Sequence, residues 1–328
     1  MTEKIEKLGK IGGINLQSFR ISDYSFIFSF LVLVMIAVAV NPNFLTYQNI
    51  STILLQASIV GIIGLGMTLI ISSGQIDLSV GSIVALVGGM SVLVLNQTQN
   101  FFLTLLFCIV FGAFLGTING LLVTVGRIAP FIVTLATMTA YRSIIVQLGQ
   151  GGPFNVNSEI LPSFRLIASG NFLGVPNLAV IFIIITALMW VLTTKLKFGR
   201  YIFAVGSNEH AAQLTGINVK FVKTACFTIT GALCGISAFL LTSRLTSIAA
   251  ANAGTAFELD AIAAVAIGGT VMSGGKGMII GTFFGALMIQ MIEGILIAAN
   301  VPPFLTGLVK GIVIIVAVLL QTIKWKRK

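Results

Sequence analysis

Charged side chains are scarce in this sequence: Asp, Glu, Lys and Arg make up only 9% of it, against roughly 25% in a soluble domain. That is too few to coat a surface that faces water. The apolar residues come instead in long blocks, and Ile50–Ser72 and Phe101–Val125 contain no charge at all. A membrane-spanning helix needs roughly 20 predominantly apolar residues. The sequence therefore predicts an all-α, polytopic transmembrane bundle and excludes a soluble domain.

Groups that bind metals or catalyse reactions are also few. His210 is the single histidine, and the nine acidic residues show no metal-ligand spacing on a helix face. The cysteines Cys108, Cys226 and Cys234 lie inside apolar blocks and form no CxxC pair, so we expect small core residues. We expect no metal site. The net charge of +10 does not indicate a nucleic-acid partner, because the basic residues collect in loops on one side of the membrane.

The apolar blocks predict about ten spans. The third and eighth of these are short, and Asp77, Glu258 and Asp260 stand at their starts. In chain order the predicted spans are Tyr24–Val40, Ile50–Ser72, Leu78–Leu95, Phe101–Val125, Ile128–Leu148, Leu178–Thr194, Thr224–Ser243, Phe257–Met272, Met278–Ala299 and Phe304–Ile323.

The distribution of Lys and Arg predicts the orientation. With both termini in the cytoplasm, 15 of the 19 basic residues fall on the cytoplasmic side, as the positive-inside rule requires. The exceptions are Arg142, Arg165, Arg244 and Lys310. The predicted organisation is a cytoplasmic tail at 1–23, a transmembrane permease domain at 24–323 with a cytoplasmic loop at 195–223, and a basic tail at 324–328.

Glycine is abundant, with 35 residues, and two runs recur at four-residue spacing. This spacing places glycines on one helix face and lets two helices approach closely. The helix-packing candidates are Gly112, Gly116, Gly120, Gly277, Gly281 and Gly285. The two runs fall in the fourth and ninth spans, so spans two to five and seven to ten could form inverted four-helix repeats, which are common in transporters.

Two acidic segments are candidates for the wall of a passage. Ser73–Ser82 interrupts two apolar blocks with almost no hydrophilic loop, and a buried Asp in a membrane is costly unless it faces protein or water. Asp77 could cap the third span, or the segment could be a broken helix along a passage. Glu258 and Asp260 leave the same two interpretations open. The candidate residues are Gly74, Gln75, Asp77, Ser79, Glu258 and Asp260.

The glycine-rich segment Gly268–Gly277 superficially resembles a phosphate-binding loop. A P-loop requires Gly, four residues and then Gly-Lys-Ser/Thr, but here Thr270 replaces the first Gly and Gly277 replaces the hydroxyl residue. We therefore expect a tight turn between two spans and no ATPase site in this chain.

The largest cytoplasmic loop contains a predicted short helix at Ser207–Ile217. Asn208 can cap its start, Glu209 suits the positive end of its dipole, and Gly216 can end it. Such a short helix is not stable alone, so it packs either on this chain or on a cytosolic partner. The candidate contact residues are Gly206, Asn208, Glu209, Ala211, Ala212, Leu214, Gly216 and Lys276.

Three segments in this order resemble the membrane permease family of ABC sugar importers, most closely its ribose-transporting members. The first is Gly-Gln-Ile-Asp-Leu-Ser-Val-Gly around Asp77, and the second runs from Gly199-Arg200-Tyr201 to Thr215–Val219. The third is Glu258–Val265, followed by Gly268-Gly269-Thr270 and Gly274–Gly277. The likeness extends from Asn41 to Lys310. Glu293 departs from it, because an uncharged residue would be expected late in the ninth span.

The resemblance implies a subunit that moves a monosaccharide, ribose or a related sugar, across the inner membrane. It implies a second permease copy, in a homodimer or pseudo-dimer, surrounded by membrane lipid. Cytosolic ABC ATPase subunits would bind ATP and Mg²⁺, while this chain would bind no cofactor. A periplasmic or lipid-anchored protein would deliver the sugar. Gly206–Gly216 would be the coupling helix on the ATPase, with Lys276 on the same face.

Two other functions are weighed against this one. An ion-coupled secondary transporter would place paired ionisable groups in the middle of the membrane, whereas the predicted topology places Asp77, Glu258, Asp260 and Glu293 near span ends. An intramembrane enzyme would need clustered His, Asp or Glu, which the sequence lacks. Uptake in ATP-depleted cells that keep a proton gradient would favour the first, and turnover of a lipid-linked substrate by the purified chain the second.

Overall fold

The structure, a computed structural model, describes residues 25–302, 305, 307–312 and 315. The tails predicted at 1–23 and 324–328 and most of the tenth predicted span, Phe304–Ile323, lie outside the described residues.

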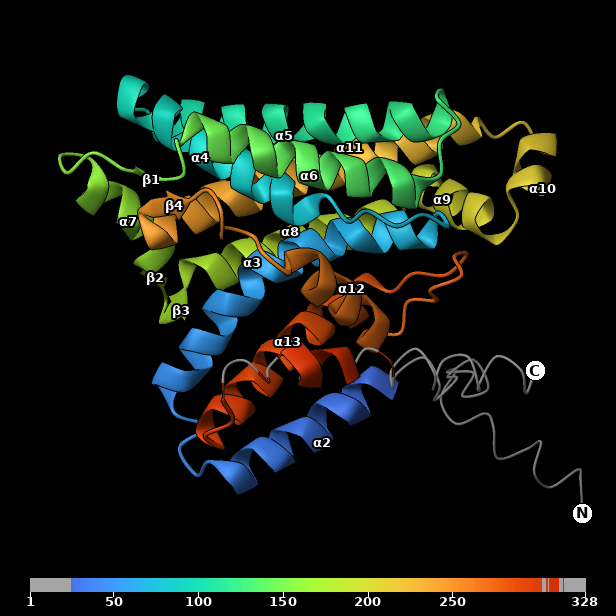
Figure 1. Cartoon of the computed structure of the whole chain (residues 1–328). Coiled ribbons are helices and arrows are strands. Elements are labelled where there is room, and N and C mark those ends of the chain that lie inside the picture. The colour runs from blue at the N-terminus through green and yellow to red at the C-terminus, as the bar shows by residue number, and fades with distance from the viewer. Residues whose placement is uncertain (1–24, 303–304, 306, 313–314, 316–328) are drawn as a thin grey trace, which may run out of the picture.

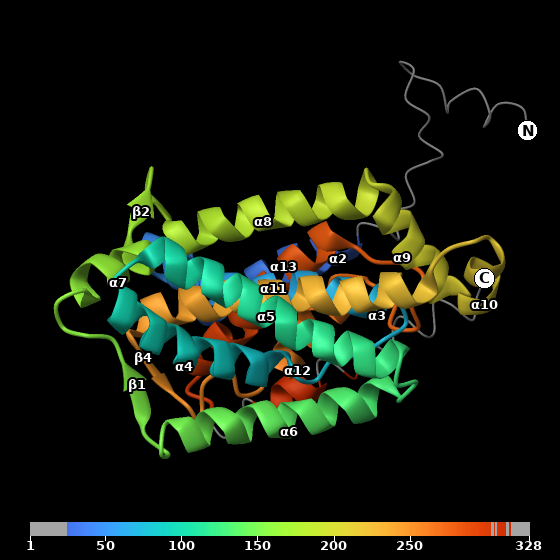
Figure 2. The ribbon, with the colours of Figure 1, turned by 90° about the horizontal axis from the view of Figure 1, so that it is seen from above.

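Long helices lying side by side make up most of the molecule (Figure 1, Figure 2). The long helices are α2 (Ser25–Val40), α3 (Tyr47–Ser72), α4 (Val80–Thr98), α5 (Phe101–Thr124), α6 (Pro130–Leu148), α8 (Asn177–Thr194), α11 (Val219–Leu245) and α13 (Ile279–Ala298). The short helices are α7 (Leu161–Ser169), α9 (Lys197–Ser207), α10 (Glu209–Leu214) and α12 (Phe257–Ile267). Seven described helices are long and apolar enough to cross a membrane.

The prediction of a mostly helical, multi-span protein is confirmed, since a helix occupies each of the nine predicted spans that the structure describes. The eighth differs from its predicted length, because α12 ends at Ile267 rather than at Met272. Gly268 and Gly269 follow it, and Gly269 has a φ of 87°, a conformation that suits glycine and ends a helix. The sequence analysis took these apolar residues as helix because hydropathy does not record backbone conformation.

Two small antiparallel sheets correct the all-α expectation. β1 (Pro153–Asn155) pairs with β4 (Ser247–Ala249), and β2 (Asn171–Phe172) pairs with β3 (Val175–Pro176). All four strands lie at the end of the bundle that also holds α7 (Figure 1). They are too short to show a periodic sequence pattern, and the β1–β4 pair joins segments far apart in the chain.

The core is built around α3, which is buried almost continuously from Ala57 to Ser72. It packs against α11, α12, α13 and α8. Aromatic side chains fill the spaces beside it: Phe182 stacks on Phe283 with ring centroids 4.8 Å apart, and Phe164 meets Phe239 edge to face. The central helix therefore holds together elements that the sequence places at both ends of the chain.

Glycine faces let α5 and α11 approach backbone to backbone. A Cβ atom on Gly112 would collide with the Gly231 carbonyl, and one on Gly116 with the Phe227 carbonyl. The second run packs in the same manner, since a Cβ on Gly285 would meet the Ala264 carbonyl of α12. Close packing of this kind supplies contact where helices cannot gain from excluding water.

We expect Gly116→Ala to lower the free energy of unfolding by about 1–3 kcal/mol, because the added methyl overpacks the α5–α11 contact. Gly294→Ala is the matched control, since nothing lies within 4 Å of that Cβ position. There, the better helix propensity of Ala should leave stability equal or higher. Thermal unfolding in detergent measures both, and equal midpoints for the two variants would contradict this packing.

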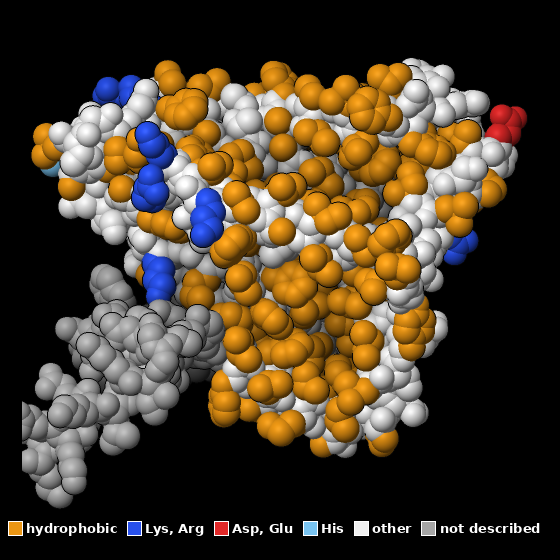
Figure 3. Space-filling model, turned by 180° about the vertical axis from the view of Figure 1, so that it is seen from behind, with side chains coloured by type: hydrophobic (Ala, Val, Ile, Leu, Met, Phe, Trp, Pro, Cys, Tyr) orange, Lys and Arg blue, Asp and Glu red, His pale blue; other side chains and the backbone are white. Residues whose placement is uncertain are grey.

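One side of the molecule presents an almost continuous apolar surface, with basic side chains gathered at one end (Figure 3). That end holds α9, α10, the α5–α6 turn and the turn between α12 and α13 (Figure 1). We call it the basic end; its described basic residues are Arg127, Lys195, Lys197, Arg200, Lys220, Lys223 and Lys276. The other end, with α7 and the strands, is called the far end.

Candidate functional site

The segment between α3 and α4 is irregular and partly buried. It leaves α3 at the basic end through Gly74, which has a φ of 78°, and α4 begins only at Val80. Asp77 lies in its middle with no exposed surface. The Asp77 Oδ1 atom accepts hydrogen bonds from the Ser79 backbone N–H at 2.8 Å and from the Ser79 hydroxyl at 2.6 Å. This local turn stands directly before α4.

A buried polar network continues from this turn into two neighbouring helices. Asn119 of α5 donates from Nδ2 to the Ser79 hydroxyl oxygen at 2.7 Å. Tyr141 of α6 donates its hydroxyl to the Leu115 carbonyl at 3.2 Å. The Asp77 Oδ2 atom, by contrast, has no hydrogen-bond partner within the described part of the chain. The network thus connects α4, α5 and α6 and leaves one carboxylate oxygen unsatisfied.

We expect Asp77→Asn to insert and fold like the wild type, because the amide oxygen can still accept the two Ser79 hydrogen bonds and no buried cation needs the charge. Asp77→Ala should lower the free energy of unfolding by about 1–3 kcal/mol, since it leaves the buried Ser79 donors unpaired. Thermal unfolding distinguishes the two variants. A loss of stability in Asp77→Asn as large as in Asp77→Ala would show that the charge itself is needed.

A second irregular segment, residues 250–256, folds back into the bundle from the far end. Arg142 of α6 holds it by donating from Nη1 to the Ala250 carbonyl at 3.0 Å and to the Ala253 carbonyl at 2.6 Å. Gly254 packs on Gly81 at the start of α4, where neither residue has room for a Cβ atom. The two irregular segments therefore meet inside the molecule. Each separates a long helix from the next one, which is α4 after the first segment and α12 after the second.

Three charged side chains form a cluster beside α12. Lys310 Nζ lies 3.0 Å from Asp260 Oδ1 and 3.2 Å from Glu293 Oε2. The side chains are partly shielded, with exposed fractions of 19% for Lys310, 10% for Asp260 and 33% for Glu293. The cluster explains Glu293, whose charge the family pattern does not predict: Lys310 neutralises it.

Asp260 and Glu293 stand near the ends of their own helices, as expected, in the first turn of α12 and five residues before the end of α13. Asp260 nevertheless lies level with the middle of α13. Helix α12 runs antiparallel to α13, with Gly268 beside Gly281 and Ala264 beside Gly285. In the same register, Asp260 lies level with Ile289 of α13. Ile289 follows the first residue of that helix, Ile279, by about 15 Å at 1.5 Å per residue. The cause is segment 250–256, which carries the chain inward before α12 begins.

At the basic end, α9 packs directly against the α3 terminus and the α12–α13 turn. Gly206 approaches the Ser72 carbonyl so closely that a Cβ atom would collide with it, and Gly275 donates its backbone N–H to the same carbonyl at 3.0 Å. Gly277 lies against the side chains of Ser72 and Thr68. Lys276 is exposed in this turn. The predicted contact residues Gly206 and Lys276 are thus brought to one place.

The predicted short helix is present as α10, and it is shorter than expected because α9 takes Ser207. Asn208 caps α10 by accepting from the Ala211 N–H at 2.9 Å, and Gly216 follows it with a φ of 83°. Ala212 is buried against this chain, whereas Leu214 is 77% exposed. The predicted contact residues of α10 therefore lie on two faces, with Ala212 turned toward this chain and Leu214 turned away from it.

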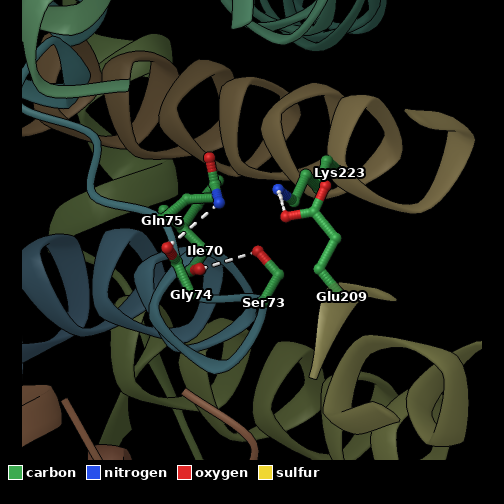
Figure 4. Close-up of polar contacts among 6 residues, drawn as sticks. All are labelled: Ile70, Ser73, Gly74, Gln75, Glu209 and Lys223. Carbon is green, nitrogen blue, oxygen red and sulfur yellow. Dashed lines mark hydrogen bonds and ion pairs between the residues drawn. The ribbon is translucent and has the colours of Figure 1, made fainter. Parts of the chain in front are cut away.

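Glu209 and Lys223 form an ion pair of 2.6 Å that connects α10 to α11 (Figure 4). Both line a cavity of about 730 Å³ together with Gln75 and the α5–α6 turn. Gln75 reaches it from the irregular segment after α3, and its Nε2 donates to the Gly74 carbonyl at 3.0 Å. Two groups of predicted site residues, in α10 and in the first irregular segment, thus share one cavity.

Sequence reasoning missed Asn119, Tyr141, Arg142 and Lys310 as parts of these networks. For the last two a signal existed, because Arg142 and Lys310 were exceptions to the positive-inside pattern. A basic residue within an apolar span and away from the cytoplasmic side is expected to have a buried partner. Asn119 and Tyr141 carried no such signal, since polar uncharged residues occur throughout membrane helices.

Comparison with known proteins gives consistent matches. The family model described as "Branched-chain amino acid transport system / permease component" matches residues 49–318. The chain is 39% identical to the ribose import permease of Haemophilus influenzae, over 92% of this chain and 93% of the relative. It is 43% identical to the ribose import permease of Bacillus subtilis, over 88% and 89% of the two chains. It is also 35% identical to the D-allose transport system permease of Escherichia coli, over 91% of each. No solved structure matches the chain.

Its seven long apolar helices define a multi-pass membrane protein. The chain belongs to the family of transport-system permease components, because the family model covers most of its length. The seven spanning helices and the bacterial permease relatives place it in the inner membrane.

Proposed function

We propose that this chain is the membrane-spanning permease subunit of an ATP-driven ABC importer that moves ribose or a closely related monosaccharide into the cell. The observation that carries the proposal is the full-length similarity to ribose import permeases from three bacteria, at 38–43% identity. Similarity to D-allose and xylose permeases, at 35% and 31%, supports the broader substrate class. As a permease subunit, the chain has no enzymatic activity of its own.

The proposed topology has about ten spans with both termini in the cytoplasm. Beyond the seven long apolar helices, α2 and α12 and the apolar stretch at Phe304–Ile323 would complete the count. The basic end would face the cytoplasm, because positive loops are retained there. The far end, with the strands and α7, would face outward.

We further infer that spans two to five and seven to ten are inverted repeats of four helices, which would frame the passage. Helices α3 and α11 are of similar length, at 26 and 27 residues, and each is followed by an irregular segment and then by a late-starting helix. Those late-starting helices, α4 and α12, run in opposite directions, and each precedes a glycine-rich helix. Broken helices that meet inside a repeat structure are typical of transporter binding regions.

The passage would run between two permease copies along the face that carries α6, α12 and the Lys310 cluster. Charged groups in the middle of a membrane face the protein interior or a watery cavity. Arg142, Glu258, Asp260 and Lys310 satisfy this, since each of them is buried or partly buried. Such a passage needs no tight sugar site, because the delivery protein selects the substrate.

Helix α10 would couple the passage to cytosolic ABC ATPase subunits, which bind ATP and Mg²⁺ in place of this chain. Leu214 supports this role, since an exposed leucine on a short cytoplasmic helix is suited to a partner's pocket. Gly206 and Gly275 join α9 to the end of α3, so movement of α10 would be transmitted to the core helix. A periplasmic or lipid-anchored sugar-binding protein would dock at the far end.

Reconstitution tests the proposed function. Proteoliposomes that contain this chain, its ATPase subunits and its sugar-binding protein should accumulate ribose only when ATP is supplied. The Lys310 cluster, in which Asp260 lies level with the middle of α13, gives the ion-coupled alternative a structural argument that the sequence alone did not give it. Accumulation driven by a proton or sodium gradient in vesicles containing this chain alone would establish that alternative and reject the ABC proposal.

A further inference from the structure

The cavity at the basic end has the size and the charge of a small-molecule site. Its volume of about 730 Å³ falls within the roughly 300–1,000 Å³ of known ligand pockets. Three cations and one acid line it: Arg127, Lys220, Lys223 and Glu209. The lining therefore has a net charge of +2 and favours an anion with about two negative charges.

The basic groups are available to a ligand. Neither Arg127 nor Lys220 has an acidic partner among the described residues, and both are exposed. Lys223 donates one of the three N–H groups of its ammonium to Glu209, at 2.6 Å, so the others remain for a ligand. Helix α6 also begins at this cavity, and no side chain caps it, so its positive dipole end adds to the field.

Gln75 supplies an independent observation. Its side chain is 8% exposed and lines the same cavity, yet its Oε1 atom has no hydrogen-bond partner within the described residues. Its Nε2 atom donates to the Gly74 carbonyl at 3.0 Å, which leaves Oε1 as the atom of this amide without a hydrogen-bond partner. In Figure 4, Gln75 and the Lys223–Glu209 pair lie on two sides of the same space. A carbonyl oxygen repels an anion but accepts a hydrogen bond from a hydroxyl group.

We propose that this cavity binds a phosphate ester that carries free hydroxyl groups, with the phosphate on Arg127, Lys220 and Lys223 and a hydroxyl donating to Gln75 Oε1. Guanidinium and ammonium groups suit phosphate oxygens, and a phosphate monoester carries about −1.5 to −2 charges at pH 7. The same chemistry occurs in a soluble sugar phosphate and in the glycerol headgroup of an anionic phospholipid. The charge balance fits the monoester better.

Binding at this position would act on α10. A phosphate next to Lys223 competes with Glu209 for the ammonium group, and that ion pair is what connects α10 to α11. A soluble sugar phosphate is what a kinase makes from an imported sugar, so the site could lower uptake as product accumulates. This consequence rests on the proposed function, whereas the binding itself does not.

Titration of the full chain in phosphatidylcholine nanodiscs tests the site with three probes: ribose 5-phosphate, ribose and inorganic phosphate. We expect ribose 5-phosphate to bind most tightly, and Lys220→Gln to weaken it by roughly tenfold, the scale of one charge-assisted hydrogen bond. Arg200→Gln, on α9 and outside the cavity lining, is the control and should not change the affinity. Gln75→Leu should reduce the affinity for ribose 5-phosphate to that for inorganic phosphate.

A second arm identifies a lipid source. If phosphatidylglycerol is retained by the purified chain, and Lys220→Gln but not Arg200→Gln releases it, the headgroup occupies the site even when ribose 5-phosphate does not bind. Equal binding of ribose and ribose 5-phosphate would overturn the proposal, as would affinities that Lys220→Gln leaves unchanged in both arms. None of these measurements needs an ATPase, so failed transport would leave their result intact.

Discussion

Leu214→Glu should release the ATPase subunits from the purified complex while leaving this chain folded. Leu214 is 77% exposed on α10 and contributes nothing to the core of the described structure, so its apolar surface is available only to a partner. Burying a leucine contributes about 1.5–3 kcal/mol, and its loss should weaken assembly by roughly tenfold to hundredfold. Co-purification of the ATPase subunits and ATP-driven uptake measure the effect.

The matched control for this experiment is Leu173→Glu, the same substitution at a leucine that is 90% exposed at the far end. It should leave the ATPase subunits bound. Ala212→Arg would be a poorer test, because Ala212 is buried against this chain and a large cation there disturbs its own packing. Normal assembly of Leu214→Glu would show that α10 does not dock through this side chain, and α10 would lose its proposed role.

Lys310→Met should destabilise the protein by about 3–5 kcal/mol and abolish uptake, because it leaves two acids facing each other without a counter-charge inside the membrane. Adding Asp260→Asn and Glu293→Gln should recover most of the stability, since the triple variant buries neutral groups. Thermal unfolding of the single and triple variants gives the comparison.

Lys220→Met is the control for Lys310→Met, because Lys220 is exposed at the basic end and has no ion pair among the described residues. It should unfold at the wild-type temperature. A Lys310→Met variant as stable as this control would mean that water screens the cluster and that its ion pairs do not contribute to stability. A stable triple variant without uptake would instead separate folding from transport and give the charges a direct role in the passage.

The spans were predictable from the sequence because hydropathy is a local property: an apolar block such as Phe101–Val125 must leave water whatever surrounds it, and α5 lies there. The cap of α10 was predictable for the same reason, since Asn208 bonds to the Ala211 N–H only three residues away. The predicted length of the eighth span failed where the backbone departs from a helix, at Gly268, because α12 ends at Ile267.

By itself, the sequence determined that this protein lies in a membrane, roughly where its helices cross, and which family its motifs resemble. Only the tertiary structure decided which charges meet, because Lys310 finds Asp260 across 50 positions of chain and no local pattern encodes that choice. It also brought Gln75 and Lys223 to one cavity, from α3's end and from α11. The physical reason is that the insertion of a segment into the membrane depends on residues nearby in the chain, whereas the ion-pair and cavity partners of a side chain depend on how whole helices pack.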